Sequence, residues 1–526
     1  MGSSRLTLSM HQVSPRGVNS AAGNELTFFH RSATRPEGWA RRRLGLGLIT
    51  VSSTGIRLTP SLERVIAKPF LAHTGGVIDQ VDRLEQIVER IRSLSSNEVA
   101  QAVESVRSRF QHRHRDIDDI WRRHLDLAGS LVPSVAAITD ESLRTLLGAT
   151  FTQEYAIEGA ALTNPSMVST GDGEFVVSLR AIGEGHISSI EFRRGRISSD
   201  GAVSIDDPSP YARPGRREET PHDRDLFASK LAEMEADDEI AGMVFALLPD
   251  LFSRDDLDSA IAVVASKDRV HPRQAETTFH MLHWLATSNY DLVFEDVDLS
   301  ERVLFPAGPA DSGGMEDARF VRFVDDDDTV RYYATYTAFD GFRILPQLIT
   351  TTDFASFSIS TLHGTCAQNK GMALFPRKID GEFVALGRHD QTNLHLLWSD
   401  DGWEWNNAEK LASPEAGWES THIGNCGSPI ETSEGWLVIT HGVGPMRTYC
   451  LGALLLDLDS PEKVVGRLPE PLLEPAEQDR NGYVPNVVYS CGSMVHGSTL
   501  ILPYGIADRE VAVGLVDVNE LIEAMA

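Results

Sequence analysis

Residues 313–320, GGMEDARF, place two adjacent carboxylates and a guanidinium where a glycine pair runs into a strand-like segment. Neighbouring side chains of a strand point to opposite faces of the sheet. Alternation therefore predicts that Glu316 and Asp317 face different ways, that Arg319 shares the face of Asp317, and that only one carboxylate serves chemistry. A carboxylic acid beside a cation suits acid catalysis on a sugar next to a bound anion.

Other glycine-bearing loops carry cations, histidines and carboxylates. Glycine at such points marks where the backbone approaches a ligand closely. The candidate residues in these loops are Arg180, Glu184, His186, Arg377, Lys378, Arg388, His389, Asp390, His422, His441, Arg447, Tyr449, Asn486, Tyr504 and Asp508. The alternative interpretation is that the cations are ordinary surface charges paired with the excess of acids.

Composition excludes several classes of function. The chain has 526 residues, enough for more than one domain, and its formal net charge of −28 argues against a nucleic-acid partner. It has no secretory signal and no run of about 18 apolar residues, which predicts no membrane span. The four cysteines lack metal-ligand spacing and are expected to be reduced, buried thiols. We expect a cytoplasmic protein without a bound metal.

The first part of the chain has a sequence pattern that predicts a helical region separate from the strands that follow. Residues 1–55 show little periodicity and are expected to be partly disordered, and residues 56–157 form an α-helical accessory region with apolar residues three and four apart. In that region HRHRD, residues 112–116, predicts a solvated basic junction, because its two histidines do not converge on a metal. Ser96 and Asn97 supply cap chemistry for one of the helices. Residues 219–285 contain a helix-length amphipathic run and predict a helical insertion.

The rest of the chain, from residue 158 to 526, has strand-like runs separated by turn clusters. A short pattern of Ser or Thr, Asp and an aromatic recurs around Asp291, Asp353 and Asp401. Irregular repeats of this period, each holding several strands, are typical of a β-propeller. The funnel of a propeller is the expected ligand site.

These residues also carry a family resemblance. GGMEDARF resembles the G-x-E-D-P-R segment of glycoside hydrolase family 130, the β-mannoside phosphorylases and β-mannosidases. The resemblance continues in order through NPSMV, YYATYTAF, NKGMALFPRKIDGEFVALGR, GSPIETSEGWLVITHGVG, GALLLDLDSPEKVVGR, GYVPNVVYSCG and YGIAD. It implies a mainly β fold, a five-bladed β-propeller, to which this chain adds the N-terminal helical region and the insertion.

The resemblance also implies roles for single residues. Asp317 becomes the general acid, its proton reaching the glycosidic oxygen through the mannose 3-hydroxyl. Phosphate binding falls to Lys378, Arg388, His441 and Tyr449. Substrate binding falls to Arg180, Glu184, His186, Glu316, Arg319, His422 and Asp508. The implied reaction uses inorganic phosphate as co-substrate and needs no cofactor or metal.

The resemblance implies a β-mannoside phosphorylase that acts reversibly and with inversion on a β-mannosidic bond and forms α-mannose 1-phosphate. Three alternatives stay open: an inverting β-mannosidase, a β-mannosyltransferase using a nucleotide-activated mannose, and a non-catalytic carbohydrate-binding propeller. Two departures from the family stand out, Ala318 in place of proline and His422 where mannosylglucose phosphorylases have lysine. The helical region could mediate homo-oligomerisation or close one side of the funnel.

Overall fold

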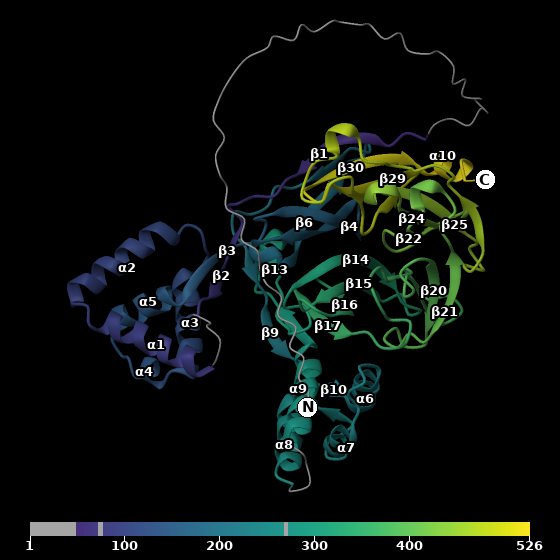
Figure 1. Ribbon diagram of the computed structural model, residues 1–526. Helices are drawn as coiled ribbons and strands as arrows, with labels where there is room; N and C mark the ends of the chain where they lie inside the picture. The colour runs from purple at the N-terminus through teal and green to yellow at the C-terminus, as the bar shows by residue number, and fades with distance from the viewer. Residues whose placement is uncertain (1–48, 72–76, 268–271, 526) are drawn as a thin grey trace, which may run out of the picture. The chain divides into compact units, whose positions relative to one another are not determined.

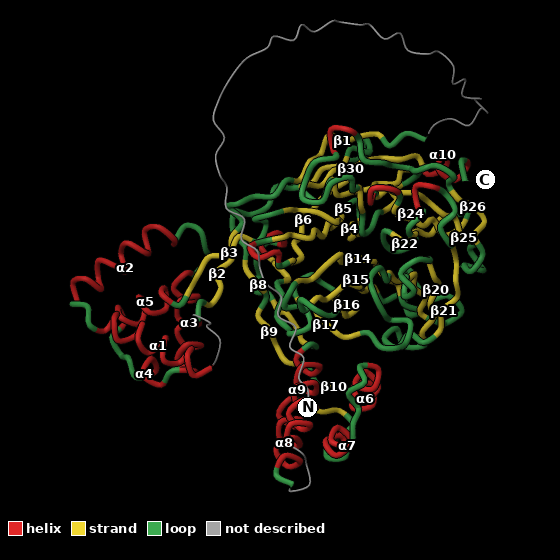
Figure 2. Tube along the Cα trace, in the orientation of Figure 1, coloured by secondary structure: helices red, strands yellow, loops and turns green. Residues whose placement is uncertain are grey.

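The computed structural model describes residues 49–71, 77–267 and 272–525 (Figure 1). Most of the segment predicted to be disordered, residues 1–48, lies outside the described residues. The described chain is mainly β, and all of its α-helices except a short one near the C-terminus gather in two stretches of sequence (Figure 2). Its four cysteines are free and buried, as predicted. Among the described residues, no helix combines the length and apolar character needed to cross a membrane.

The first helical stretch lies between two paired strands, β2 (Val65–Pro69) and β3 (Thr152–Ala156). Its helices are α1 (Val77–Arg92), α2 (Ser96–Phe110), α3 (Ile117–Leu131), α4 (Pro133–Ala136) and α5 (Glu141–Thr150). Buried apolar residues from the helices, including Leu84, Leu125 and Leu147, form a core of their own.

Two details of this stretch differ from the sequence-based expectation. The cap of α2 is Ser95, one residue before the predicted pair, and it forms a reciprocal capping box with Glu98. The HRHRD junction is not simply solvated, because His114 is only 5% exposed and its Nε2 lies 2.8 Å from Glu154 Oε1. Burial explains the difference: the turn packs against the β2–β3 pair.

The second helical stretch lies between β9 (Arg216–Glu219) and β12 (Tyr290–Val293). It comprises the short strands β10 (His222–Asp223) and β11 (Leu251–Phe252) and the helices α6 (Arg224–Glu233), α7 (Glu239–Phe245), α8 (Arg254–Ala265) and α9 (Pro272–Thr287). The run read as one helix is two, because Glu235 adopts a left-handed φ of 56° and Asp238 caps α7.

The remaining strands form successive antiparallel groups along the chain (Figure 1). The first group is β4 (Ala161–Gly171), β5 (Glu174–Ile182), β6 (Ser188–Ile197) and β7 (Val203–Ile205). The second is β14 (Gly314–Val324), β15 (Val330–Phe339), β16 (Ile344–Thr351) and β17 (Ser356–Thr361). Gly314 pairs with Ser188, and this joins both groups, with β8 (Arg213–Pro214), β9, β12 and β13 (Arg302–Leu304), in one sheet.

Three further groups complete the β region. The third is β18 (Ala373–Leu374), β19 (Phe383–Gly387), β20 (Leu394–Ser399) and β21 (Asn407–Ala412). The fourth is β22 (His422–Asn425), β23 (Ile430–Thr432), β24 (Gly435–Val443), β25 (Tyr449–Leu456) and β26 (Val464–Arg467). The last is β27 (Val488–Tyr489), β28 (Met494–His496), β29 (Thr499–Ile506), β30 (Glu510–Asp517) and β1 (Ser52–Leu58), followed by α10 (Val518–Glu523).

The recurring aspartates have a local structural role in most repeats. Asp353 accepts the backbone N–H groups of Ala355 and Ser356 in a turn, and Asp401 does the same after β20. Asp291 instead lies inside β12, opposite Ser358. The spacing therefore identified real turns at two positions and a strand at the third.

Candidate active site

The start of β14 contains a bulge that sets the direction of both carboxylates. Its register with β15 shifts between Glu316 and Arg319, and Asp317 adopts a φ of 56°. Both carboxylates therefore reach the same guanidinium: Arg180 Nη1 donates to Asp317 Oδ1 (3.0 Å) and Arg180 Nη2 to Glu316 Oε1 (2.8 Å). The prediction that strand alternation separates them is wrong, because a bulge breaks the two-residue period.

Asp317 is held by two further residues. Asn164 Nδ2 donates to Asp317 Oδ1 at 2.6 Å, from a second bulge in β4 where Asn164 has a φ of 46°. Arg319 Nη1 donates to the Asp317 backbone carbonyl (2.9 Å). Burial alone would raise the pKa of Asp317, but Arg180, Arg319, Lys370 and the bond from Asn164 outweigh it and lower that pKa to about 2. With this pKa, Asp317 is ionised at neutral pH.

A second carboxyl beside Asp317 behaves in the opposite way. Burial, then the charge of Asp317, raises the pKa of Asp508 to about 6. Thr163 Oγ1 lies 3.4 Å from Asp508 Oδ1, on the strand that also carries Asn164. Asp508 can therefore exchange a proton close to neutral pH.

Lys370 contacts this carboxylate cluster and was not among the predicted residues. Its Nζ forms an ion pair with Glu316 Oε2. The predicted lysine, Lys378, instead pairs with Asp325 (3.0 Å) and Asp326 (3.5 Å). Those aspartates follow the far end of β14, on the order of 20 Å along the strand from Asp317. Lys378 is thus placed outside the cluster, and Lys370, eight positions earlier in the same sequence motif, lies in it.

A ring cluster lies beside Arg319. His441, from β24, has its ring centroid 4.9 Å from that of Tyr489 and 6.1 Å from that of Tyr449. His422, from β22, lies 5.8 Å from His441. Arg319 Nη2 donates to the Tyr489 hydroxyl (2.8 Å), which connects the ring cluster to the carboxylate cluster. Tyr489 and Asn164 are the site residues from remote strands that sequence reasoning missed.

Several buried polar atoms of this region have no hydrogen-bond partner within the described part of the chain. They are Arg319 Nε, Arg388 Nη1, His422 Nε2 and His441 Nδ1. Buried polar groups are nearly always paired in folded proteins. Burial, then Arg388, lowers the pKa of His422 to about 4 and holds that of His441 well below its usual range, so both imidazoles are neutral and each has one N–H to donate. Together with the guanidiniums they suit an anion that supplies several acceptor oxygens.

The other predicted contacts lie in the turn after β5. His186, with a φ of 64°, places Nδ1 2.7 Å from the Tyr483 hydroxyl, and both side chains are exposed. Glu184 is exposed, and its backbone carbonyl accepts a bond from Tyr155 (2.7 Å). The structure therefore does not connect Glu184 to the carboxylate cluster. In the described ranges, no set of three or more His, Cys, Asp or Glu side chains is arranged to hold a metal ion.

A buried carboxylate and a half-buried one share a single guanidinium, beside neutral imidazoles and cations with free donors. This defines the class of site: an acid–base group adjoining an anion-binding wall in a mainly-β protein. Comparison with known proteins agrees with this class. Residues 293–526 match the family model for glycoside hydrolase family 130, described as beta-1,4-mannooligosaccharide phosphorylase.

Among curated relatives, a 1,2-beta-oligomannan phosphorylase of Thermoanaerobacter sp. (strain X514) is 36% identical over 215 residues, which cover 40% of this chain and 70% of that protein. A beta-1,2-mannobiose phosphorylase of Listeria innocua serovar 6a is 32% identical over 229 residues, 42% of this chain and 63% of that protein. A solved structure of the beta-1,2-mannobiose phosphorylase from Listeria innocua gives a TM-score of 0.43 at 21% identity, covering 70% of this chain and 93% of that one. The chain belongs to glycoside hydrolase family 130.

Proposed function

We propose that the protein is a β-mannoside phosphorylase that cleaves a β-mannosidic bond with inorganic phosphate and releases α-mannose 1-phosphate. The observation that carries the proposal is the position of Asp317 next to cations and imidazoles with unpartnered buried donors. A site that uses water as its nucleophile has no need for such a concentration of anion-binding groups. The names of the curated relatives support the same reaction.

In this proposal phosphate binds against Arg388, His441 and Tyr449, with His422 beside them, and one of its oxygens attacks the anomeric carbon. Attack from the face opposite the leaving group inverts that carbon, so the β-mannoside yields the α-phosphate. Asp317 delivers a proton to the leaving oxygen through the mannose 3-hydroxyl. Arg180 holds the Asp317 carboxylate in position, and Glu316, which Lys370 pairs with, holds Arg180.

The negative charge of bound phosphate would also raise the low pKa of Asp317. The neighbouring cations keep that carboxyl ionised, which opposes a role as acid. A phosphate dianion beside Arg319 and Arg388 offsets part of their field, and a nearby negative charge raises the pKa of a carboxyl. Phosphate binding therefore prepares the acid as well as supplying the nucleophile.

We further propose that the β region is a five-bladed propeller with the site at its funnel. Shared apolar clusters join each strand group to the next, in the order first to second, second to third, third to fourth and fourth to last. Another cluster joins the last group to the first, and Leu162 N–H donates to the Arg509 carbonyl (3.1 Å) across that junction. A cycle of this kind is what a closed propeller requires. The free cysteines support a cytoplasmic location.

The decisive experiment incubates the protein with β-1,2- and β-1,4-mannobiose, with and without phosphate. We expect mannose 1-phosphate to form only when phosphate is present. Free mannose at a rate independent of phosphate would replace the proposal with the β-mannosidase. Transfer from a nucleotide-activated mannose, with no phosphorolysis, would replace it with the mannosyltransferase.

A further inference from the structure

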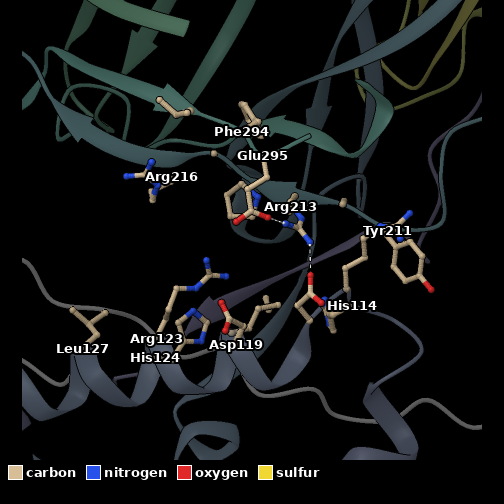
Figure 3. Close-up of a pocket in the computed structure, with 18 residues that line it drawn as sticks. His114, Asp119, Arg123, His124, Leu127, Tyr211, Arg213, Arg216, Phe294 and Glu295 are labelled. Atoms are coloured by element: carbon tan, nitrogen blue, oxygen red, sulfur yellow. Dashed lines mark hydrogen bonds and ion pairs between the residues drawn. The ribbon is translucent and has the colours of Figure 1, made fainter. Parts of the chain in front are cut away.

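A separate cavity of about 680 Å³ lies between α3, with the turn before it, and residues 211–216 (Figure 3). Its remaining wall is formed by residues 293–295 at the end of β12. None of the residues of the candidate active site lines this cavity. Its size falls in the range of about 300–1,000 Å³ that small-molecule sites occupy.

The opposite walls of the cavity are joined by ion pairs. Arg115 binds Glu301 through two bonds of 2.8 Å and lies over the ring of Tyr211, 4.5 Å from its centroid. Arg213 binds Glu295 (2.7 Å; Figure 3). The same guanidinium lies 3.4 Å from Asp116. These contacts hold the turn before α3 against the sheet.

The sheet side of the cavity is also anchored from behind. Arg64, 3% exposed, donates from Nη1 to the carbonyls of Ser209 (2.9 Å) and Tyr211 (3.1 Å), and it pairs with the buried Glu158 and Glu191. A wall fixed by buried charges does not need to reorganise when a ligand enters, which lowers the cost of binding. The cavity is therefore preformed.

The charges that line the cavity leave two arginines available. Its acids are engaged, Glu295 and Asp116 with Arg213, and Asp119 with Arg122. Arg123 forms no ion pair within the described ranges, and its guanidinium points from α3 into the cavity (Figure 3).

The second arginine lies on the sheet side. In the part of the chain that the structure describes, Arg216 has one ion-pair partner, Glu218, two positions along its own strand, and its side chain is 68% exposed. Phe294 contributes an apolar ring to the same wall (Figure 3). One guanidinium without an ion pair and one exposed guanidinium with a single neighbouring partner, beside a ring, fit a ligand with an anionic group and a less polar body.

We propose that this cavity is a second ligand site and that it binds a sugar monophosphate. The phosphate lies between Arg123 and Arg216, and the sugar packs against Phe294. The choice of a sugar phosphate over another small anion rests on the proposed function, which produces one. A site in the accessory region can then respond to the product without occupying the catalytic cluster.

The test titrates mannose 1-phosphate calorimetrically into the full chain and into three variants. Arg388→Ala identifies binding at the candidate active site. Arg123→Ala/Arg216→Ala removes the two arginines proposed to hold the phosphate, and Arg90→Ala/Arg92→Ala on α1 removes the same charge elsewhere. We expect two sites per chain in the parent and in the α1 control. In the cavity variant we expect one site to weaken by about tenfold or more.

Unchanged affinity and stoichiometry in the cavity variant would overturn this proposal, as would equal loss in the α1 control. Inorganic phosphate and mannose are titrated as well, and saturation of the cavity by phosphate alone with the same affinity would remove the sugar from the assignment and overturn it. The proposed function fails separately, through absence of phosphorolysis in the parent. A cavity-dependent loss of binding would stand in that case.

Discussion

Replacement of Asp317 by asparagine tests the assignment of the acid with the smallest change of shape. Asparagine keeps one side-chain oxygen that can accept from Asn164 Nδ2 or Arg180 Nη1, but it carries neither the charge nor the acidic proton. Loss of a general acid typically costs a factor on the order of 10²–10⁴ in rate. We expect that fall in kcat for phosphorolysis with little change in the KM of the mannoside, because the group acts in the transition state.

The same replacement has a cost in stability that follows from the pKa. Arg180, Arg319 and Lys370 overcome the effect of burial and lower the pKa of Asp317 from 3.8 to about 2, a difference worth about 2 kcal/mol of folding free energy. For a depressed carboxyl this stabilisation is complete above its unfolded-state pKa and is lost as pH falls through the folded-state pKa. Asp317→Asn should therefore lower the thermal midpoint at pH 7, and the difference from the parent should shrink towards pH 2.

The measurement combines mannose 1-phosphate release at saturating phosphate with thermal unfolding over a pH series. Asp325→Asn is the matched control, since Asp325 is also paired with a cation, Lys378, but lies beyond the far end of β14. Activity of Asp317→Asn equal to that of the parent would refute the acid assignment. An equal loss of activity in the Asp325 variant would show that the assay reports folding.

Three further predictions concern the neighbours of Asp317. Lys370→Ala should lower kcat/KM by about tenfold, the cost of one lost charge-assisted contact, whereas Lys378→Ala should leave kcat/KM unchanged. Steady-state kinetics of the two variants tests this. A loss in Lys378→Ala and none in Lys370→Ala would favour the sequence-based assignment instead. Arg388→Ala should raise the KM of phosphate by about tenfold or more and leave that of the mannoside nearly constant; equal effects on both substrates would remove Arg388 from the phosphate site. Burial, then the charge of Asp317, raises the pKa of Asp508 to about 6, so the folded state loses stability as pH rises from its unfolded-state pKa to about 6. The thermal midpoint of Asp508→Asn, measured relative to the parent, should therefore be higher at pH 7 than at pH 4. A difference between variant and parent that does not change with pH would contradict a raised pKa of Asp508.

Much of the site could be read from local sequence because it lies on motifs that occur in order along the strands. Arg180, Asp317 and Asp508 are each marked by glycine or turn residues next to a strand, and the structure brings them together. The prediction that Glu316 and Asp317 face opposite ways failed because Asp317 has a left-handed backbone conformation. A positive φ at a residue other than glycine has no reliable sequence signature.

The residues that were missed depend on contacts between distant strands. Asn164 is 153 positions from Asp317, and Tyr489 is 170 positions from Arg319. No local pattern reports such a contact; it follows from the register of separate strand groups. Lys370 and Lys378 share one motif, and only the path of the chain decides which of them reaches the carboxylates. The helices were predictable from apolar periodicity, but the break at Glu235 again depended on a left-handed residue.

Arg319 connects the two halves of the site. Its Nη1 binds the Asp317 carbonyl, its Nη2 binds the Tyr489 hydroxyl, and its Nε has no partner in the described chain. One rigid guanidinium therefore connects the backbone of the proposed acid to the ring cluster of the proposed phosphate site. An anion that accepts a hydrogen bond from Nε also offsets part of the positive field of Arg319 at Asp317, because one planar guanidinium carries both interactions. Binding of the anion and readiness of the acid are thus linked through a single buried side chain, which is the arrangement that a phosphorylase needs and a simple carbohydrate-binding site does not.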